Sequence, residues 1–509
     1  MSIVDLPNEI LDAVWFYLGL PDWCALRLSC RVLYSKSLAT FVSRHVKRIS
    51  VLITSDGLRE LEAIATHEIF RAHVQELWLV PEVFRGHYDV DYDTFVQAKL
   101  MAAGYFDQPA VAHGTHSSIT ELVRWAIDNL RTDYESYQSA VANHLQLIQA
   151  DSLPHTLATC MKQLTNLSTV GLETYPPSAA GHKHPPCLGR MALRRRLNHH
   201  PFANPHIPHN WERSPDYLWS EENRSIRAPV FSALLQAIPT STAQIQQLRT
   251  CSQGEHCGIP PEQLTLTDTH YTTLQPHLQA LQTLDLCLQY ADPHSDTTES
   301  PLLRLLLAAA PTLTTLKVSQ WSTKDELPAH HFTQLSQHIH FTRLSTLSLH
   351  WIEVTQPSFR AFLRTAAPTL QTLSLVSVSL LDRIDLPTRS NPFYDAVSDL
   401  WRQFCDGIRD DLPGLRSLEM KDLAYRGHVL RIEDGMRARS GRKPSRRVSA
   451  AVALAYDATQ AGVGLAAWLD QLQLPEHRSA RLGQPLPGRF SSMAACSDLL
   501  RLWGSGTKK

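Results

Sequence analysis

The apolar pattern Leu-x-x-Leu-x-Leu recurs along the chain, with Val or Met at some of its last positions. In each copy apolar and polar residues alternate at the end of the motif, which is typical of a strand with one buried face. The middle leucines of four copies, Leu284, Leu316, Leu347 and Leu373, are 32, 31 and 26 residues apart. The pattern predicts strands over 74–79, 281–286, 313–318, 344–349, 370–375 and 415–420, with a weaker copy at 167–172.

Amphipathic helices are predicted before several of these strands, over 302–309, 359–366 and 393–408. The spacing is close to leucine-rich-repeat periods of about 20 to 29 residues. Helices and strands this short cannot bury their apolar faces alone, so we expect them to stack into a solenoid. An unrelated α/β domain with leucine-rich strands is the alternative, because no column of Asn or Cys closes the repeats.

The first 45 residues show helical spacing instead. Ile10, Leu11, Val14 and Leu18 recur on one helical face after Pro7. Two further short helices are predicted, from 21 to 28 and from 31 to 42. A unit of this size buries too little surface to be stable alone. We therefore expect its apolar side to pack on the remaining chain or on another protein.

The order and spacing of these N-terminal residues resemble an F-box. The matching residues are Leu6-Pro7-Asn8-Glu9-Ile10-Leu11, then Leu18, then Leu26 to Cys30-Arg31. The resemblance implies a three-helix domain that docks onto the Skp adaptor of an SCF-type ubiquitin ligase. The run Trp15-Phe16-Tyr17 departs from the family and leaves open which ring faces the adaptor. By resemblance the adaptor-facing residues are Leu6, Pro7, Ile10, Leu11, Leu18, Leu26 and Leu28.

The repeated strands similarly resemble the leucine-rich repeats of F-box proteins. The predicted fold is therefore α/β, a three-helix F-box followed by an irregular leucine-rich-repeat-like solenoid. Leucines on such strands point into the core, so alternate residues face outward on the inner surface. These outward positions are Asp285, Cys287, Lys317, Ser319, Ser348, His350, Ser374, Val376, Glu419 and Lys421. We take Asp285, Lys317, His350, Glu419 and Lys421 as candidate substrate-binding residues; an ordinary solvated strand face is the alternative for each.

Composition divides the chain into six expected segments. Residues 175–227 are rich in Pro, His, Asn and Arg without periodicity, which predicts a low-order insertion. Six basic residues between 437 and 447 predict a solvated loop, with an import signal or an anionic-partner patch as the alternative. The segments are the F-box (1–45), first helix and strand units (46–174), the insertion (175–227), the solenoid (228–425), a basic loop (426–447) and a C-terminal helical cap (448–509).

Charge and cysteine content narrow the class of partner. The chain has 48 basic and 49 acidic residues, so no global field attracts nucleic acid or a membrane surface. Nine scattered cysteines fit reduced thiols better than a disulfide framework. No apolar run approaches the roughly 20 residues of a membrane span. We expect a cytoplasmic or nuclear protein whose partners are other proteins.

A search for chemistry gives little. His67 and His73 are six residues apart, whereas a zincin helix needs histidines four apart. Cys251, His256, Cys257 and His270 lack the Cys-x-x-Cys pair of a zinc finger. We therefore expect no enzyme activity, cofactor or metal. The leading hypothesis is the substrate-recognition subunit of an SCF-type (cullin-RING) ubiquitin ligase, and the alternative is a non-degradative scaffold with the same F-box and repeats.

Overall fold

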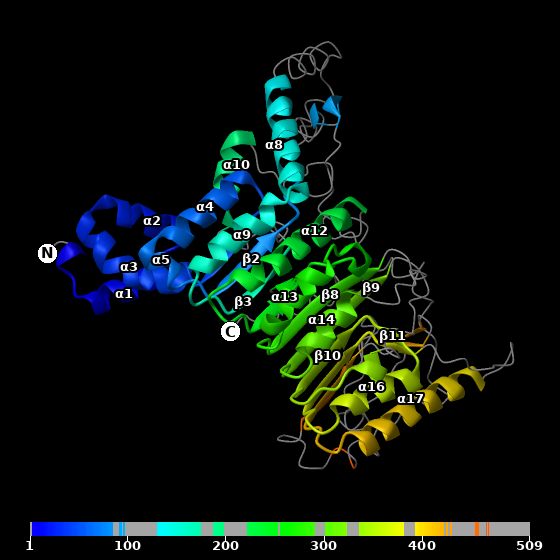
Figure 1. Ribbon diagram of the computed structural model, residues 1–509. Helices are drawn as coiled ribbons and strands as arrows, with labels where there is room; N and C mark the ends of the chain where they lie inside the picture. Colours follow the sequence, from blue (N-terminus) through cyan, green and yellow to red (C-terminus); the bar gives the residue numbers. More distant parts are fainter. Residues whose placement is uncertain are drawn as a thin grey trace, which may run out of the picture.

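The computed structural model describes residues 3–84, 91–93, 95–96, 130–174, 187–197, 221–252, 255–290, 301–322, 335–380, 392–421, 424–425, 428–429, 453–457, 465 and 467. They form a mixed α/β structure with a small helical bundle at the N-terminus and a large, mostly parallel sheet behind it (Figure 1). The α/β class predicted from the sequence is confirmed.

The N-terminal bundle contains three helices, as the apolar spacing predicts. They are α1 (Asn8–Tyr17), α2 (Leu20–Ser29) and α3 (Arg31–His45), preceded by the short 3-10 helix η1 (Ile3–Asp5). Pro7 occupies the N-cap of α1, where its missing N–H costs nothing. The Cys30 side chain accepts a hydrogen bond from the Leu33 N–H and caps α3.

The large sheet has eleven strands, and nine of them are parallel and follow chain order. These nine are β1 (Arg48–Leu52), β2 (Glu76–Val80), β3 (Thr169–Leu172), β5 (Gln247–Arg249), β8 (Thr283–Tyr290), β9 (Thr315–Ser322), β10 (Thr346–His350), β12 (Thr372–Val376) and β14 (Ser417–Lys421). The two edges differ from this rule. The two-residue strand β4 (Cys187–Leu188) lies outside β1, and β17 (Ala453–Asp457) runs antiparallel outside β14.

Helices pack along the sheet in the intervals between strands (Figure 1). They are α4 (Ser55–Thr66), α5 (Glu68–Arg71), α8 (Arg131–Gln149), α9 (Ser152–Gln163), α10 (Arg190–Leu197), α12 (Glu221–Ala237), α13 (Asp268–Leu278), α14 (Pro301–Ala309), α16 (Gln356–Ala366) and α17 (Pro392–Asp411), with 3-10 helices η3 (Ile238–Thr240) and η4 (Pro261–Gln263). A second sheet contains β11 (Glu353–Val354), β13 (Ser379–Leu380), β15 (Ala424–Tyr425) and β16 (His428–Val429), and β6 (Cys251–Ser252) forms a hairpin with β7 (Glu255–His256).

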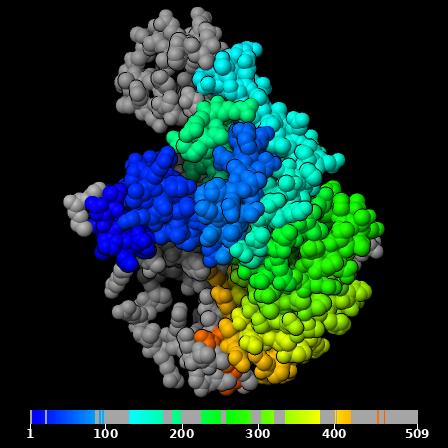
Figure 2. Space-filling model, turned by 60° about the vertical axis from the view of Figure 1, so that its left-hand side comes forward, coloured from blue at the N-terminus to red at the C-terminus, as the bar shows by residue number. Residues whose placement is uncertain are grey.

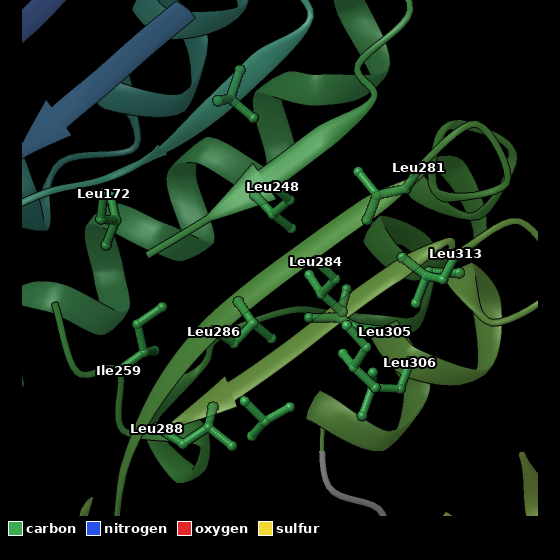
Figure 3. Close-up of a cluster of buried hydrophobic side chains, with 14 of the residues drawn as sticks. Leu172, Leu248, Ile259, Leu281, Leu284, Leu286, Leu288, Leu305, Leu306 and Leu313 are labelled. Atoms are coloured by element: carbon green, nitrogen blue, oxygen red, sulfur yellow. The ribbon is translucent and has the colours of Figure 1, made fainter. Parts of the chain in front are cut away.

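Leucines of the repeated pattern fill the layer between strands and helices. Leu284 and Leu286 of β8 lie in one cluster with Leu305 and Leu306 of α14 (Figure 3). The predicted column of middle leucines is the actual register, because Leu284, Leu316, Leu347 and Leu373 are successive partners on β8, β9, β10 and β12. Each fully buried leucine contributes about 1.5–3 kcal/mol, so this layer dominates the stability of the sheet.

Two predictions about irregular segments are wrong where the structure describes them. The segment 175–227 contains β4 and α10, and α12 begins within it at Glu221. Leu193 and Leu197 of α10 pack against α8, which gives this arginine-rich segment an apolar face after all. The helix predicted from 448 is wrong over 453–457, where the chain forms the strand β17 and pairs with the free edge of β14. Leu465 and Ala467, the other described residues of this segment, are helical. The basic residues 437–447 and the end of the predicted cap lie outside the described residues.

Within the described part of the chain, none of the helices is both long and apolar enough to cross a bilayer.

Candidate functional site

The N-terminal bundle builds its own small core from aromatic residues. Leu11 and Trp15 are four residues apart on α1 and pack against Trp23 of α2 and Leu33 of α3. The Trp15 and Trp23 ring centroids are 5.8 Å apart. Between the two core positions of α1, Asp12 and Ala13 are exposed and Val14 is half-buried.

Large apolar side chains remain exposed on this bundle. Tyr17 and Leu28 are 86% and 85% exposed, values close to those of an unfolded chain. Isolated exposed apolar residues are ordinary, but several on a unit of this size are typical of an interaction surface. These side chains, which we call the exposed bundle residues, are Ile10, Phe16, Tyr17, Leu28, Val32 and Tyr34.

Three of the seven residues assigned to the adaptor by resemblance are exposed: Pro7, Ile10 and Leu28. Leu6, Leu18 and Leu26 are half-buried against the bundle core. Leu11 differs from the expectation. It is 1% exposed, because it shares the inward face of α1 with Trp15.

The sequence left open the orientation of Phe16 and Tyr17, and sequence reasoning missed Val32 and Tyr34 among the exposed bundle residues. The aromatic run on α1 was the available signal, but spacing alone does not tell which ring enters the core. Trp15 does so, and Phe16 and Tyr17 stay outside with their ring centroids 5.6 Å apart.

Helix α3 belongs to the bundle and to the large core at once. Val42 and Val46 are buried in the large core, and Phe41 packs against both cores. On the other side, Arg44 Nη1 donates hydrogen bonds to the carbonyls of Trp15 and Phe16, 3.3 and 3.2 Å away. Helix α3 therefore joins the bundle to the first units of the sheet, and Figure 2 shows the bundle lying directly against them.

The face of the large sheet opposite the leucine layer is the second candidate site, and we call it the inner face. Strand register places one residue of each strand in a row across it. The row runs Ser50, Trp78, Gly171, Arg249, Asp285, Lys317, Ser348, Ser374, Glu419 and Ala455.

The first half of the inner face is occupied by its own ion pairs around Trp78. The Arg48 and Arg249 guanidinium groups lie 4.6 and 5.8 Å from the Trp78 ring centroid. Gly171 on the intervening strand permits this close packing, since a Cβ there would be 2.1 Å from the Arg249 carbonyl oxygen and 3.0 Å from Trp78 Cζ3. Arg48 pairs with the Glu173 carboxylate and Arg249 Nη2 lies 3.2 Å from Asp285 Oδ2. The sequence did not reveal this group because β5, which carries Arg249, lacks the leucine motif.

The second half of the inner face, formed by the strands from β8 to β14, carries the five candidate substrate-binding residues. His350 Nε2 is 2.9 Å from Ser348 Oγ. Burial lowers the pKa of His350; the nearby carboxylates of Asp285 and Glu419 oppose this shift, and the ammonium groups of Lys317 and Lys421 add to it. The sequence-based prediction therefore assembled residues that do lie close together.

The predicted outward residues are not equally accessible. Lys317 and Glu419 are exposed, and His350 and Lys421 are half-buried. Asp285 is only 4% exposed and is engaged by Arg249, which differs from the expectation of a free carboxylate. Cys287, Ser319 and Ser348 are also buried.

The segment at Ile259 adds a parallel bridge to β8. It runs beside the end of β8, where the Ile259 N–H donates to the Cys287 carbonyl at 2.9 Å.

A buried polar group at the carboxyl ends of β2 and β8 is structural. Arg227 of α12 pairs with Glu82, which follows β2. Its Nη1 donates to the Gly258 carbonyl at 3.2 Å and to Gln289 Oε1 at 3.0 Å. The neighbouring Cys257 is fully buried, and burial raises its thiol pKa to about 12. A neutral, enclosed thiol is not a nucleophile, so this group ties elements together and offers no reactive atom.

Comparison with known proteins adds no family assignment. No protein-family model matches the chain, and no curated protein is similar to it in sequence. Among the residues that the structure describes, no three His, Cys, Asp or Glu side chains are arranged to hold a metal ion. The exposed bundle residues and the inner face are thus the two surfaces on which a function can be argued.

Proposed function

We propose that the protein is the substrate-recognition subunit of an SCF-type ubiquitin ligase. In this proposal the N-terminal bundle is an F-box that binds a Skp-type adaptor and, through it, the cullin scaffold. The parallel strands in chain order act as leucine-rich repeats, and their inner face holds a protein substrate. The observation that carries the proposal is the N-terminal bundle with F-box spacing, which leaves Ile10 and Leu28 exposed.

The mechanism is proximity. A substrate held on the inner face is kept near the ubiquitin-charged conjugating enzyme, so its lysines react at a raised effective concentration. Effective concentration falls when the tether is loose or too short. Helix α3 supports a tight coupling, because Val42 is anchored in the large core while Arg44 holds the end of α1.

Binding of a Skp adaptor by the full chain tests the docking role. A fragment ending at residue 45 is unsuitable, because it strips Val42 and Phe41 of their partners in the large core. Substituting Ile10→Ser together with Leu28→Ser removes two exposed apolar contacts and leaves the bundle core intact. We expect about a hundredfold loss of adaptor affinity, since interface anchors each contribute more than 1 kcal/mol.

Leu307→Ser is the matched control, because Leu307 is an exposed leucine on α14, far along the chain from the bundle. It should leave adaptor affinity unchanged. Unaltered binding by the Ile10→Ser/Leu28→Ser chain, with its circular dichroism spectrum intact, would contradict the proposal.

Protein turnover separates degradation from scaffolding. Cells that carry the Ile10→Ser/Leu28→Ser chain should accumulate the substrate. The inner face of this variant still binds the substrate, but the variant no longer recruits the adaptor and the rest of the ligase. If the adaptor binds the wild-type chain but no protein changes its half-life, the alternative of a non-degradative scaffold is favoured.

A further inference from the structure

The second half of the inner face carries two exposed charges of opposite sign. Lys317 on β9 and Glu419 on β14 are both exposed. Within the described part of the chain, Lys317 has no ion-pair partner, and Glu419 accepts only a hydrogen bond from the neutral Ser374 hydroxyl at 2.8 Å. Asp285 differs from both, because it is buried and engaged by Arg249. The two exposed charges are therefore available to a ligand.

Strand register fixes the spacing of these two charges. Lys317, Ser348, Ser374 and Glu419 are successive partners on β9, β10, β12 and β14. Neighbouring strands are about 4.8 Å apart, so three intervals separate the Cα atoms of Lys317 and Glu419 by about 14 Å. An extended chain rises about 3.4 Å per residue, and four residues therefore cover this distance.

The strand surface between Lys317 and Glu419 carries short polar side chains. Only the short side chains of Ser348 and Ser374 lie between Lys317 and Glu419 in this row, and Ser348 is buried with its hydroxyl next to His350. Lys421 is half-buried in the adjoining row, two residues beyond Glu419, and Val376 of β12 lies between it and His350 in that row. Lys317 and Glu419 flank these serines, and the Glu419 carboxylate reaches back to the Ser374 hydroxyl. An extended peptide that crosses the row therefore meets a charged group at each side of Ser348.

We propose that this row binds an extended segment of the substrate with an acidic and a basic side chain four residues apart. The acidic side chain lies against Lys317, the basic side chain against Glu419, and small polar residues cover Ser348 and Ser374. This inference rests on the proposed function, in which the inner face holds a protein substrate. This pair of charges also selects against segments with charges of one sign. A uniformly acidic segment is repelled at Glu419, and a uniformly basic segment is repelled at Lys317.

Selection of random twelve-residue peptides displayed on phage, with the full-length chain as bait, tests the charge pattern. The wild-type chain should enrich peptides with one acidic and one basic residue separated by three others. Lys317→Glu should select basic residues at both positions, and Glu419→Lys acidic residues at both. Each charge reversal should lower the affinity for the peptide selected by the wild-type chain about tenfold, and this loss of affinity should be smaller at high salt.

Lys162→Glu is the matched control, because Lys162 is an exposed lysine on α9, on the helical side of the sheet. It should select the same peptides as the wild-type chain. Peptides without the charge pair, or the same pair selected by both reversal variants, would overturn the inference. Adaptor affinity of these variants is measured separately, so a chain that selects the charge pair but binds no adaptor contradicts the ligase role alone.

Discussion

Thr342 Oγ1 donates a hydrogen bond to the carbonyl of Pro311, 31 residues earlier in the chain and 2.7 Å away. Related contacts join other successive units: Thr312 Oγ1 donates to the Leu281 carbonyl and Thr369 Oγ1 to the Leu344 carbonyl, both at 2.9 Å. Thr312 and Thr369 directly precede the first leucine of a motif, and Thr342 stands one residue earlier in its own motif. We call these three residues the threonine column; their hydroxyls tie the turns that lead into β9, β10 and β12 to the preceding unit.

Replacing a threonine of this column by valine should lower the free energy of unfolding. Thr312→Val and Thr369→Val keep the shape of the side chain but leave a carbonyl oxygen without its donor, at a cost of about 1 kcal/mol each. Urea unfolding measures the change. Thr273→Val on α13 is the control, since its hydroxyl bonds only to carbonyls of its own helix. Equal losses at all three positions would show that the column has no special role.

Ser377 adopts a left-handed backbone conformation, with φ of 53°, where the chain leaves β12 for β13. Its N–H donates to the Lys421 carbonyl at 2.8 Å, which fixes the turn. Ser377→Gly should raise the free energy of unfolding by about 0.5–1 kcal/mol, because relief of the Cβ clash exceeds the entropy cost of glycine. Ser417→Gly on β14 should instead destabilise the protein. A lower melting temperature for Ser377→Gly would contradict the strain argument.

Stability should fall in mild acid because of His144. This side chain is buried on α8 with Nδ1 2.6 Å from the Ile53 carbonyl, and burial lowers its pKa from 6.5 to about 4. As pH falls, the unfolded chain takes up the proton first. The contribution of neutral His144 is complete above pH 6.5 and is lost as pH falls toward 4, by at most about 3 kcal/mol.

Urea unfolding at a series of pH values measures this dependence. His144→Gln should remove most of the difference between pH 6.5 and pH 4, even though the variant is less stable throughout. His73→Gln, at an exposed histidine, should keep the wild-type dependence. An unchanged slope in His144→Gln would mean that other groups control acid unfolding.

The sequence predicted the strands that carry the leucine motif and even their register, because buried leucines must align for neighbouring strands to share one core. It failed at β4, α10 and β17. Each of these is held by a distant partner: β4 by β1, α10 by α8 and β17 by β14. The local sequence does not indicate such long-range pairings. In α10 the arginines lower the apolar content, so its two buried leucines do not stand out as a helical face.

Only part of the candidate site on the inner face could be predicted from the sequence. Lys317 and Glu419 follow from the alternation of a strand, and both are exposed as expected. The burial of Asp285 does not follow, because its partner Arg249 lies on β5, a three-residue strand without the motif. Accessibility on the inner face depends on which neighbour a charge meets, and that is a property of the sheet rather than of one strand.

The two edges of the eleven-stranded sheet interrupt its parallel ladder. β4 offers only two residues as a template, and β17 reverses the direction of the ladder, so another copy of the chain finds no long parallel edge to extend. Open parallel sheets are prone to join edge to edge. The chain thus ends its parallel ladder in two different ways, with a two-residue strand at one edge and a reversed strand at the other.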